Sequence, residues 1–175
     1  MQDINIRLLL PADRELLFQY LQQFREDSMS HLSPHPVDRE TVDSIFDHVQ
    51  PDSIRRYVAV DVTRQQIIAY MIIKQGFSGE DAGRYYGKNL FFDHTTTCTF
   101  APSVSKEWQN SGLGSAMFEY ILNDLRKLGL KRIILWGGVP ATNSLALHYY
   151  MKHGFLQTGS FRYNEMDSFD MIREL

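Results

Sequence analysis

Hydrophobic and polar positions alternate with two different periods along the first fifty residues. Residues 4–10 begin with an apolar residue at every second position, which is typical of a half-buried strand. After a break at residues 11–13, leucines and aromatic residues recur at helical spacing up to Phe24, which predicts an amphipathic helix. Residues 28–36 contain two prolines and predict a loop, and residues 37–49 predict a second helix.

The middle of the chain changes to a strand pattern. Residues 57–62 and 67–73 are rich in β-branched residues and flank a short turn, which predicts a hairpin. Residues 75–94 contain four glycines and five aromatic residues without a clear period, so we expect a long irregular loop with a function. Residues 95–100 predict a strand through their β-branched content.

The last third of the chain alternates helices and strands. An apolar helical face runs from Met117 to Leu128, and residues 133–136 form a short apolar run that suits a buried strand. Residues 143–153 predict another helix, and residues 156–163 and 168–172 predict the final strands. The whole order, β-α-α-β-β-β-α-β-α-β-β, predicts one mixed α/β domain over residues 1–175.

Composition restricts the function classes that we expect. A net charge of −3 gives no global signal for nucleic acid or for an anionic membrane, so we expect neither partner. The single cysteine, Cys98, excludes an internal disulfide and a cysteine-based zinc cluster, and it fits a cytoplasmic protein. The first residues lack a signal-peptide pattern, and no apolar run approaches the roughly 20 residues of a membrane helix. The six histidines form no metal-binding pattern, so we expect no metal.

Two glycines precede the helix that carries Met117, where an anion would need close access to the backbone. Gly112 and Gly114 remove the Cβ atoms that would block a phosphate at the start of a helix, although the same residues also suit a simple turn. A mononucleotide P-loop would need a lysine before Ser115, and a dinucleotide fingerprint would need a third glycine at Met117. A third pattern, Gln/Arg-x-x-Gly-x-Gly/Ala, is met in full with Gln109 at its first position.

This third pattern resembles the GNAT superfamily of acyl-CoA-dependent N-acetyltransferases. In that family an aliphatic strand residue stands about five positions before the Gln/Arg position, and Val104 keeps this spacing. A second family block places Asn, Ala, Tyr and Gly-Phe along and after the next helix. The matching residues are Asn143, Ala146, Tyr150, Gly154 and Phe155. The two motifs lie in the order that the family requires.

The resemblance implies a fold, a reaction and a set of site residues. The expected fold is a mixed, mostly antiparallel sheet flanked by helices, and the expected reaction is direct transfer of an acetyl group from acetyl-CoA to a primary amine. The acceptor would be a small molecule or a peptide, and a homodimer is an open alternative to a monomer. Tyr150 would give a proton to the leaving thiolate, and Asn143 would contact the pantetheine. The other cofactor-binding residues would be Val104, Gln109, Asn110, Ser111, Gly112, Leu113, Gly114 and Ser115.

The general base is not assigned by the motifs. Many family members carry an acidic residue on the central strand, but residues 95–100 contain none. Asp93 and His94 are the candidates just before that strand, and Glu26 and His31 are candidates near the first helix. We expect Cys98 to be a buried, inert thiol, because His94 would lie about 13 Å away along a strand.

The acceptor is expected between the two predicted loops, 28–36 and 75–94. Acidic residues of the second loop would attract a cationic amine, and aromatic residues of the same loop would line its path. The acidic residues of the second loop are Glu80, Asp81 and Asp93, and its aromatic residues include Tyr85, Tyr86, Phe91 and Phe92. Two other functions stay open: an acyl-CoA-binding sensor without turnover, which the missing strand carboxylate favours, and a scaffold in which the glycines are only a turn.

Overall fold

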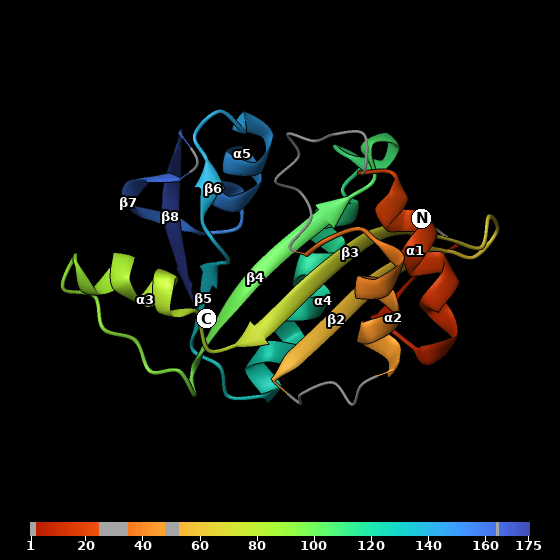
Figure 1. The fold of residues 1–175 in the computed structure, drawn as a ribbon, viewed down its shortest axis with the longest axis horizontal. Coiled ribbons are helices and arrows are strands. Elements are labelled where there is room, and N and C mark those ends of the chain that lie inside the picture. Colours follow the sequence, from red (N-terminus) through yellow and green to blue (C-terminus); the bar gives the residue numbers. More distant parts are fainter. Residues whose placement is uncertain (1–2, 25–34, 48–52, 164) are drawn as a thin grey trace. The chain divides into compact units, whose positions relative to one another are not determined.

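The structure is a computed structural model that describes residues 3–24, 35–47, 53–163 and 165–175. The chain divides into two compact units, each built from two segments. Unit 1 consists of residues 1–73 and 101–121, and unit 2 consists of residues 74–100 and 122–175. Strand β4 (Thr97–Val104) and helix α4 (Leu113–Lys127) each begin in one unit and end in the other (Figure 1).

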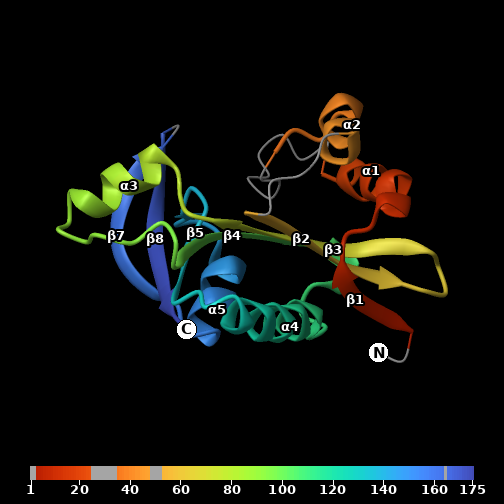
Figure 2. The same ribbon diagram turned by 90° about the horizontal axis from the view of Figure 1, so that it is seen from below.

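Unit 1 is a sheet with helices on both sides. Its strands follow the order β1-β2-β3-β4, and β1 pairs antiparallel with β2. The strands are β1 (Ile4–Leu8), β2 (Ile54–Asp61), most of β3 (Gln66–Gln75) and the second half of β4. The helices are η1 (Pro11–Asp13), α1 (Arg14–Gln22), α2 (Arg39–Asp47), η2 (Lys106–Trp108) and the first half of α4. Helices α1 and α2 lie on one side of the strands, and α4 lies on the other (Figure 2).

The core of unit 1 lies between helices α1 and α2 and the sheet. Each helix buries one apolar stripe, and the strands bury the side chains that face it. The buried residues are Leu17, Tyr20, Leu21, Val42, Ile45, Val58, Val60, Ile67, Tyr70 and Ile72. Burial of each such side chain contributes roughly 1.5–3 kcal/mol, so this core holds α1 and α2 on the strands.

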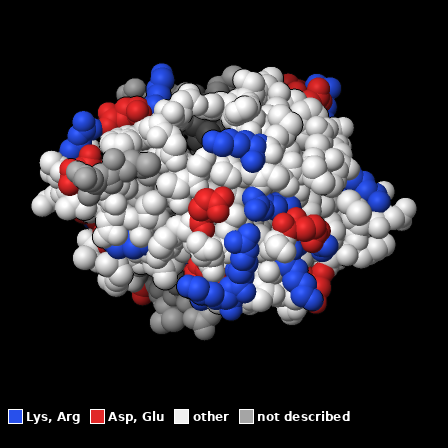
Figure 3. All heavy atoms as spheres, turned by 180° about the vertical axis from the view of Figure 1, so that it is seen from behind, with Lys and Arg blue, Asp and Glu red and all other residues white. Residues whose placement is uncertain are grey.

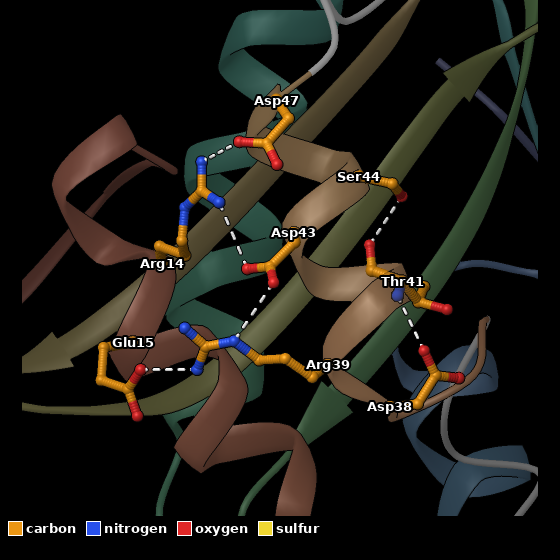
Figure 4. A network of polar contacts seen from close by, with 8 residues as sticks. All are labelled: Arg14, Glu15, Asp38, Arg39, Thr41, Asp43, Ser44 and Asp47. Atoms are coloured by element: carbon orange, nitrogen blue, oxygen red, sulfur yellow. Dashed lines mark hydrogen bonds and ion pairs between the residues drawn. The ribbon is translucent and has the colours of Figure 1, made fainter.

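Helices α1 and α2 are also joined at the surface by a network of ion pairs (Figure 4). Arg14 contacts Asp43 at 3.2 Å and also pairs with Asp47. Arg39 contacts Glu15 at 2.7 Å and Asp43 at 3.3 Å. Because these side chains are solvent-exposed or nearly so, the network orients the two helices more than it stabilises them.

Unit 2 contains the remaining strands of the same eight-stranded sheet, beginning with the first half of β4. The order is β4-β5-β8-β6, and β7 pairs with β8. Strands β4 and β5 are parallel, whereas β8 is antiparallel to β5, β6 and β7. The further strands are β5 (Arg132–Leu135), β6 (Val139–Pro140), β7 (Leu156–Tyr163) and β8 (Met166–Glu174). The helices are α3 (Gly79–Tyr86), α5 (Ser144–Lys152) and the second half of α4.

The predicted fold class is confirmed: the described residues form a mixed, mostly antiparallel arrangement of eight strands flanked by helices. The predicted irregular loop over residues 75–94 is wrong in its middle, where helix α3 runs from Gly79 to Tyr86. Ser78 caps this helix by accepting a hydrogen bond from the Asp81 N–H, and acidic residues occupy its first turn. Glycines at 79 and 83 hid the helical pattern, and both are at exposed positions.

Strand β4 extends beyond the predicted residues 95–100 and includes Pro102. It runs to Val104, although its parallel pairing with β5 stops at Phe100. Within unit 1 the remaining residues of β4 form the edge of the sheet, where a proline is tolerated because one N–H of an edge strand needs no partner.

Candidate active site

The loop between β4 and α4 carries the first motif, and we call residues 109–115 the glycine loop. Its conformation is fixed by short-range hydrogen bonds. The Gln109 side-chain amide donates to the Val104 carbonyl at 3.2 Å, and the Ser111 hydroxyl donates to the Trp108 carbonyl at 2.6 Å. The Leu113 N–H donates to the Ser111 hydroxyl oxygen at 3.3 Å, directly at the start of helix α4. Predicted cofactor-binding residues 109–115 therefore form one continuous turn that ends in a helix N-terminus.

Gly112 is the position in this loop where only glycine fits without strain. Its φ is +88°, a left-handed conformation, and the preceding turn also contains Asn110 at φ 58°. A Cβ built on Gly112 meets no atom within 4 Å, and the residue is exposed. The space beside the backbone is therefore open to a ligand, and the partial positive charge of the α4 N-terminus favours an anion there.

The second motif lies on helix α5 in unit 2. Asn143 is the N-cap, and its side-chain oxygen accepts from the Ala146 N–H at 3.0 Å. Tyr150 is only 7% exposed, and its ring packs against the rings of Phe100 and Phe155, with centroids 6.5 Å and 5.3 Å away. Burial raises the pKa of Tyr150, so its hydroxyl is protonated at neutral pH.

The two predicted bases before β4 are both exposed. The Asp93 carboxylate accepts from the Thr95 N–H and from the Thr95 hydroxyl, each at 2.7 Å. These hydrogen bonds lower the pKa of Asp93, so it is a poor proton acceptor. The His94 ring stacks on Phe77 with centroids 3.7 Å apart. The other two candidates, Glu26 and His31, lie outside the described residues.

The expected acidic attraction for a cationic acceptor is wrong at Asp81. Asp81 is buried and pairs with Arg84, which also contacts Asp170 at 3.0 Å. Asp170 is fully buried and contacts Lys88 at 2.5 Å. Two carboxylates and two cations thus neutralise each other and attach helix α3 to strand β8. Tyr85 of the same helix belongs to the core of unit 2 and does not line a path for a substrate.

Sequence reasoning missed a polar cluster in unit 1. The Tyr70 hydroxyl accepts from the Arg56 guanidinium at 3.1 Å and lies 3.3 Å from Nε2 of His35. Burial lowers the pKa of His35 and raises the pKa of Tyr70 to about 12. His35 precedes α2, Arg56 lies on β2 and Tyr70 lies on β3. Because the three residues are far apart in the sequence, no local motif could have indicated that they meet.

One further prediction concerns the environment of the single cysteine. The side chain of Cys98 is fully buried, as predicted, and burial raises the pKa of its thiol to about 12. Lys and Arg side chains gather near the centre of the face in Figure 3, with Asp and Glu side chains among them.

Over the described ranges, no group of His, Cys, Asp and Glu side chains is placed to hold a metal ion. None of the helices in these ranges is long and apolar enough to cross a membrane.

Solved structures with the same fold cover nearly the whole chain. An acetyltransferase of the GNAT family from Streptococcus pneumoniae is 21% identical over 98% of this chain and 99% of its own, with a TM-score of 0.72. A ribosomal-protein-alanine N-acetyltransferase from Brucella melitensis is 17% identical over 98% and 99%, with a TM-score of 0.75. A putative phosphinothricin N-acetyltransferase is 21% identical over 98% of each chain, with a TM-score of 0.68. At these identities the likeness shows the fold.

The sequence itself carries the family assignment. A comparison with curated proteins gave no match. The family model described as the acetyltransferase (GNAT) family matches residues 18–155, which include both motifs and most of the described strands and helices. The chain therefore belongs to the GNAT family of acetyltransferases, whose members transfer an acyl group from acyl-CoA to an amine.

Proposed function

We propose that this enzyme transfers an acetyl group from acetyl-CoA to a primary amine of a small molecule or peptide by direct attack. The open backbone at Gly112 is the observation that carries the proposal, because it combines a left-handed glycine, free space and a helix N-terminus at one point. The pyrophosphate of the donor would lie against the main chain of the glycine loop, where no side chain has to move aside.

The pantetheine of the donor would contact the last residues of β4 in unit 1. We assign its contacts to the backbone near Val104, where β4 continues beyond its pairing with β5. The side-chain oxygen of Asn143 caps α5, so the side-chain NH2 is the group that would donate a hydrogen bond to the pantetheine. This capping bond also fixes the orientation of that amide.

Tyr150 is our candidate for the general acid. When the tetrahedral intermediate collapses, the C–S bond breaks and the leaving thiolate takes the hydroxyl proton. Free tyrosine has a pKa of about 10 and a free thiol about 8.5. Burial raises the pKa of Tyr150 because it disfavours the anion, and it would raise the pKa of a thiol bound beside that ring for the same reason. The transfer is therefore less uphill than the raised pKa of Tyr150 alone would suggest.

The amine must lose a proton before it attacks, which costs about 4 kcal/mol for a lysine-like amine at pH 7. Strand β4 carries no acidic residue along Thr97–Val104. Asp93 and His94 remain our candidate bases, and Asp93 is the poorer of the two because its hydrogen bonds to Thr95 favour the unprotonated form.

We further propose that the two compact units are halves of one domain, because β4 and α4 each run through both of them. A cytoplasmic location and the choice between monomer and homodimer stay predictions. The single buried Cys98 supports a reducing compartment.

The test compares variants of the two glycines that lie just before and just after helix α4. Gly112→Asp adds a carboxylate where the pyrophosphate would lie, so calorimetry should show a loss of acetyl-CoA affinity of about 100-fold or more. Gly129→Asp is the control, since Gly129 lies at the other end of α4, has φ +72° and is equally open. Both variants carry the backbone strain, but only the first adds charge to the proposed site. Equal affinities would refute the assignment of the loop.

Turnover is measured in parallel as release of free CoA thiol against a panel of amines. An enzyme should release thiol with at least one amine. Saturable binding of acetyl-CoA without release across the panel would instead favour the sensor, which the absence of a carboxylate on β4 supports.

A further inference from the structure

Lys74 and Trp136 form a pair in unit 2 that the proposed mechanism does not use. Lys74 is near the end of β3, and Trp136 directly follows β5. The Lys74 ammonium lies over the indole ring, 5.5 Å from its centroid, which is a cation–π contact. Lys74 is half-buried, and Trp136 is 36% exposed, so the pair is open to a ligand.

The polar groups of this pair have no partner among the described residues. Lys74 forms no ion pair or side-chain hydrogen bond there, and the indole N–H of Trp136 has no acceptor. Three other half-buried cations of unit 2 each contact a carboxylate: Arg84, Lys88 and Arg132. A cation that is partly removed from water and balanced only by a ring face lacks the anion that such positions normally have.

The position of the pair connects it to the proposed reaction. The main-chain N–H of Trp136 donates to the Phe100 carbonyl at 3.1 Å, one residue beyond the last pair of β4 with β5. The ring of Phe100 in turn contacts the ring of Tyr150, the proposed acid. The Thr99 hydroxyl donates to the Lys74 carbonyl at 3.3 Å, so Lys74 of β3 lies beside Thr99 of β4. Lys74 and Trp136 therefore stand where the paired segment of β4 ends.

We propose that Lys74 and Trp136 bind a carboxylate of the acceptor, so that the acceptor is an amine that also carries a carboxylate, as an amino acid does. This inference rests on the proposed function. The ammonium of Lys74 supplies the charge, and the indole N–H supplies a second donor. A polyamine would instead bring a second positive charge to Lys74. Of the acidic residues that could have favoured it, Asp81 is neutralised by its ion pair with Arg84.

The experiment uses the full chain and a panel of the common amino acids, each with its carboxamide, and spermidine as a cationic probe. Binding is measured by calorimetry in the presence of CoA, and turnover by release of CoA thiol from acetyl-CoA. We expect at least one amino acid to bind about tenfold or more tightly than its amide, because the amide removes the charge. Binding is recorded without turnover, so a failure of acetyl transfer is seen separately from a failure of carboxylate recognition.

Three variants identify the group that recognises the carboxylate. Lys74→Gln should remove the preference for acid over amide and raise KM for the acid about tenfold, with kcat little changed. Trp136→Phe keeps a ring face and removes the N–H, so it should reduce the preference only in part. Lys127→Gln is the control, because Lys127 is an exposed lysine of the same unit and its loss changes the net charge equally.

Three outcomes would overturn the inference. The first is a panel in which no amino acid binds more tightly than its amide. The second is a preference that Lys74→Gln leaves intact. The third is a Lys74→Gln variant that weakens acetyl-CoA instead, by one factor for every acceptor, since the anion at Lys74 would then be a phosphate of the donor.

Discussion

The glycine loop and helix α3 both follow a strand and both contain glycines, but different interactions hold them. The loop is fixed by partners that are near in the sequence, such as Gln109 with Val104, five residues apart, and Ser111 with Trp108, three apart. Helix α3 is fixed by side chains that are far apart in the sequence, such as Arg84 with Asp170, 86 residues away. The first region is therefore visible as a motif, and the second is not.

The same contrast applies to what each region can do. In the glycine loop the main chain is exposed and the side chains serve to shape it, which suits a ligand common to a whole family. In helix α3, Asp81 and Arg84 form an ion pair, and Arg84 also contacts Asp170, so Asp81 has a structural role and does not indicate a cationic acceptor. Charge in a sequence indicates a binding site only where its partner is not supplied by the fold.

The largest effect should come from removing Asp170, the buried carboxylate that Arg84 and Lys88 share. Asp170→Ala leaves Arg84 and Lys88 without their shared carboxylate, and breaking a buried pair of this kind costs about 3–5 kcal/mol of unfolding free energy. Urea denaturation measures the change. Asp167→Ala is the control, because Asp167 is an exposed aspartate on the same strand and should cost less than about 0.5 kcal/mol. Equal costs would mean that α3 is held by its apolar contacts alone.

The second largest effect should come from a change at Tyr150, which separates the chemical step from the binding of acetyl-CoA. Tyr150→Phe removes one hydroxyl from a packed ring, so kcat should fall about 100-fold, as expected for a lost general acid, while acetyl-CoA affinity stays within about threefold. Burial raises the pKa of Tyr150, so the wild-type hydroxyl should stay protonated above pH ~10, and kcat should show no alkaline loss from this group below that pH. An unchanged kcat in the variant would remove Tyr150 from the mechanism.

Most of the fold was open to prediction because its signals are local. The strands and helices with a clear apolar period, such as 14–22 and 144–152, were expected within a few residues of their observed bounds. Helix α3 was missed because Gly79 and Gly83 weaken its apolar period. The ion pair that attaches the helix to the sheet also involves a distant residue, Asp170 of β8. The cap at Ser78 with acidic residues behind it was the signal that could have indicated it.

The candidate site was predictable to a similar extent. Gly112 and Tyr150 belong to two motifs with fixed spacing, so the sequence alone indicated them. The pair of Lys74, on β3, and Trp136, directly after β5, exists only after the strands have paired, and so does the cluster around Tyr70. No periodicity or spacing relates such residues, because their distance along the chain carries no physical constraint.

The smallest effect should come from a side chain of the glycine loop itself. Gln109→Ala removes the hydrogen bond to the Val104 carbonyl, which contributes about 1 kcal/mol, so acetyl-CoA affinity should fall only about fivefold. Calorimetry compares it with Gln157→Ala, the loss of an exposed glutamine of β7, which should leave affinity unchanged. A loss as large as that expected for Gly112→Asp would mean that the Gln109 side chain binds the donor directly. The glycine loop would then hold its ligand through side chains, as α3 holds its strand, and the contrast between the two regions would disappear.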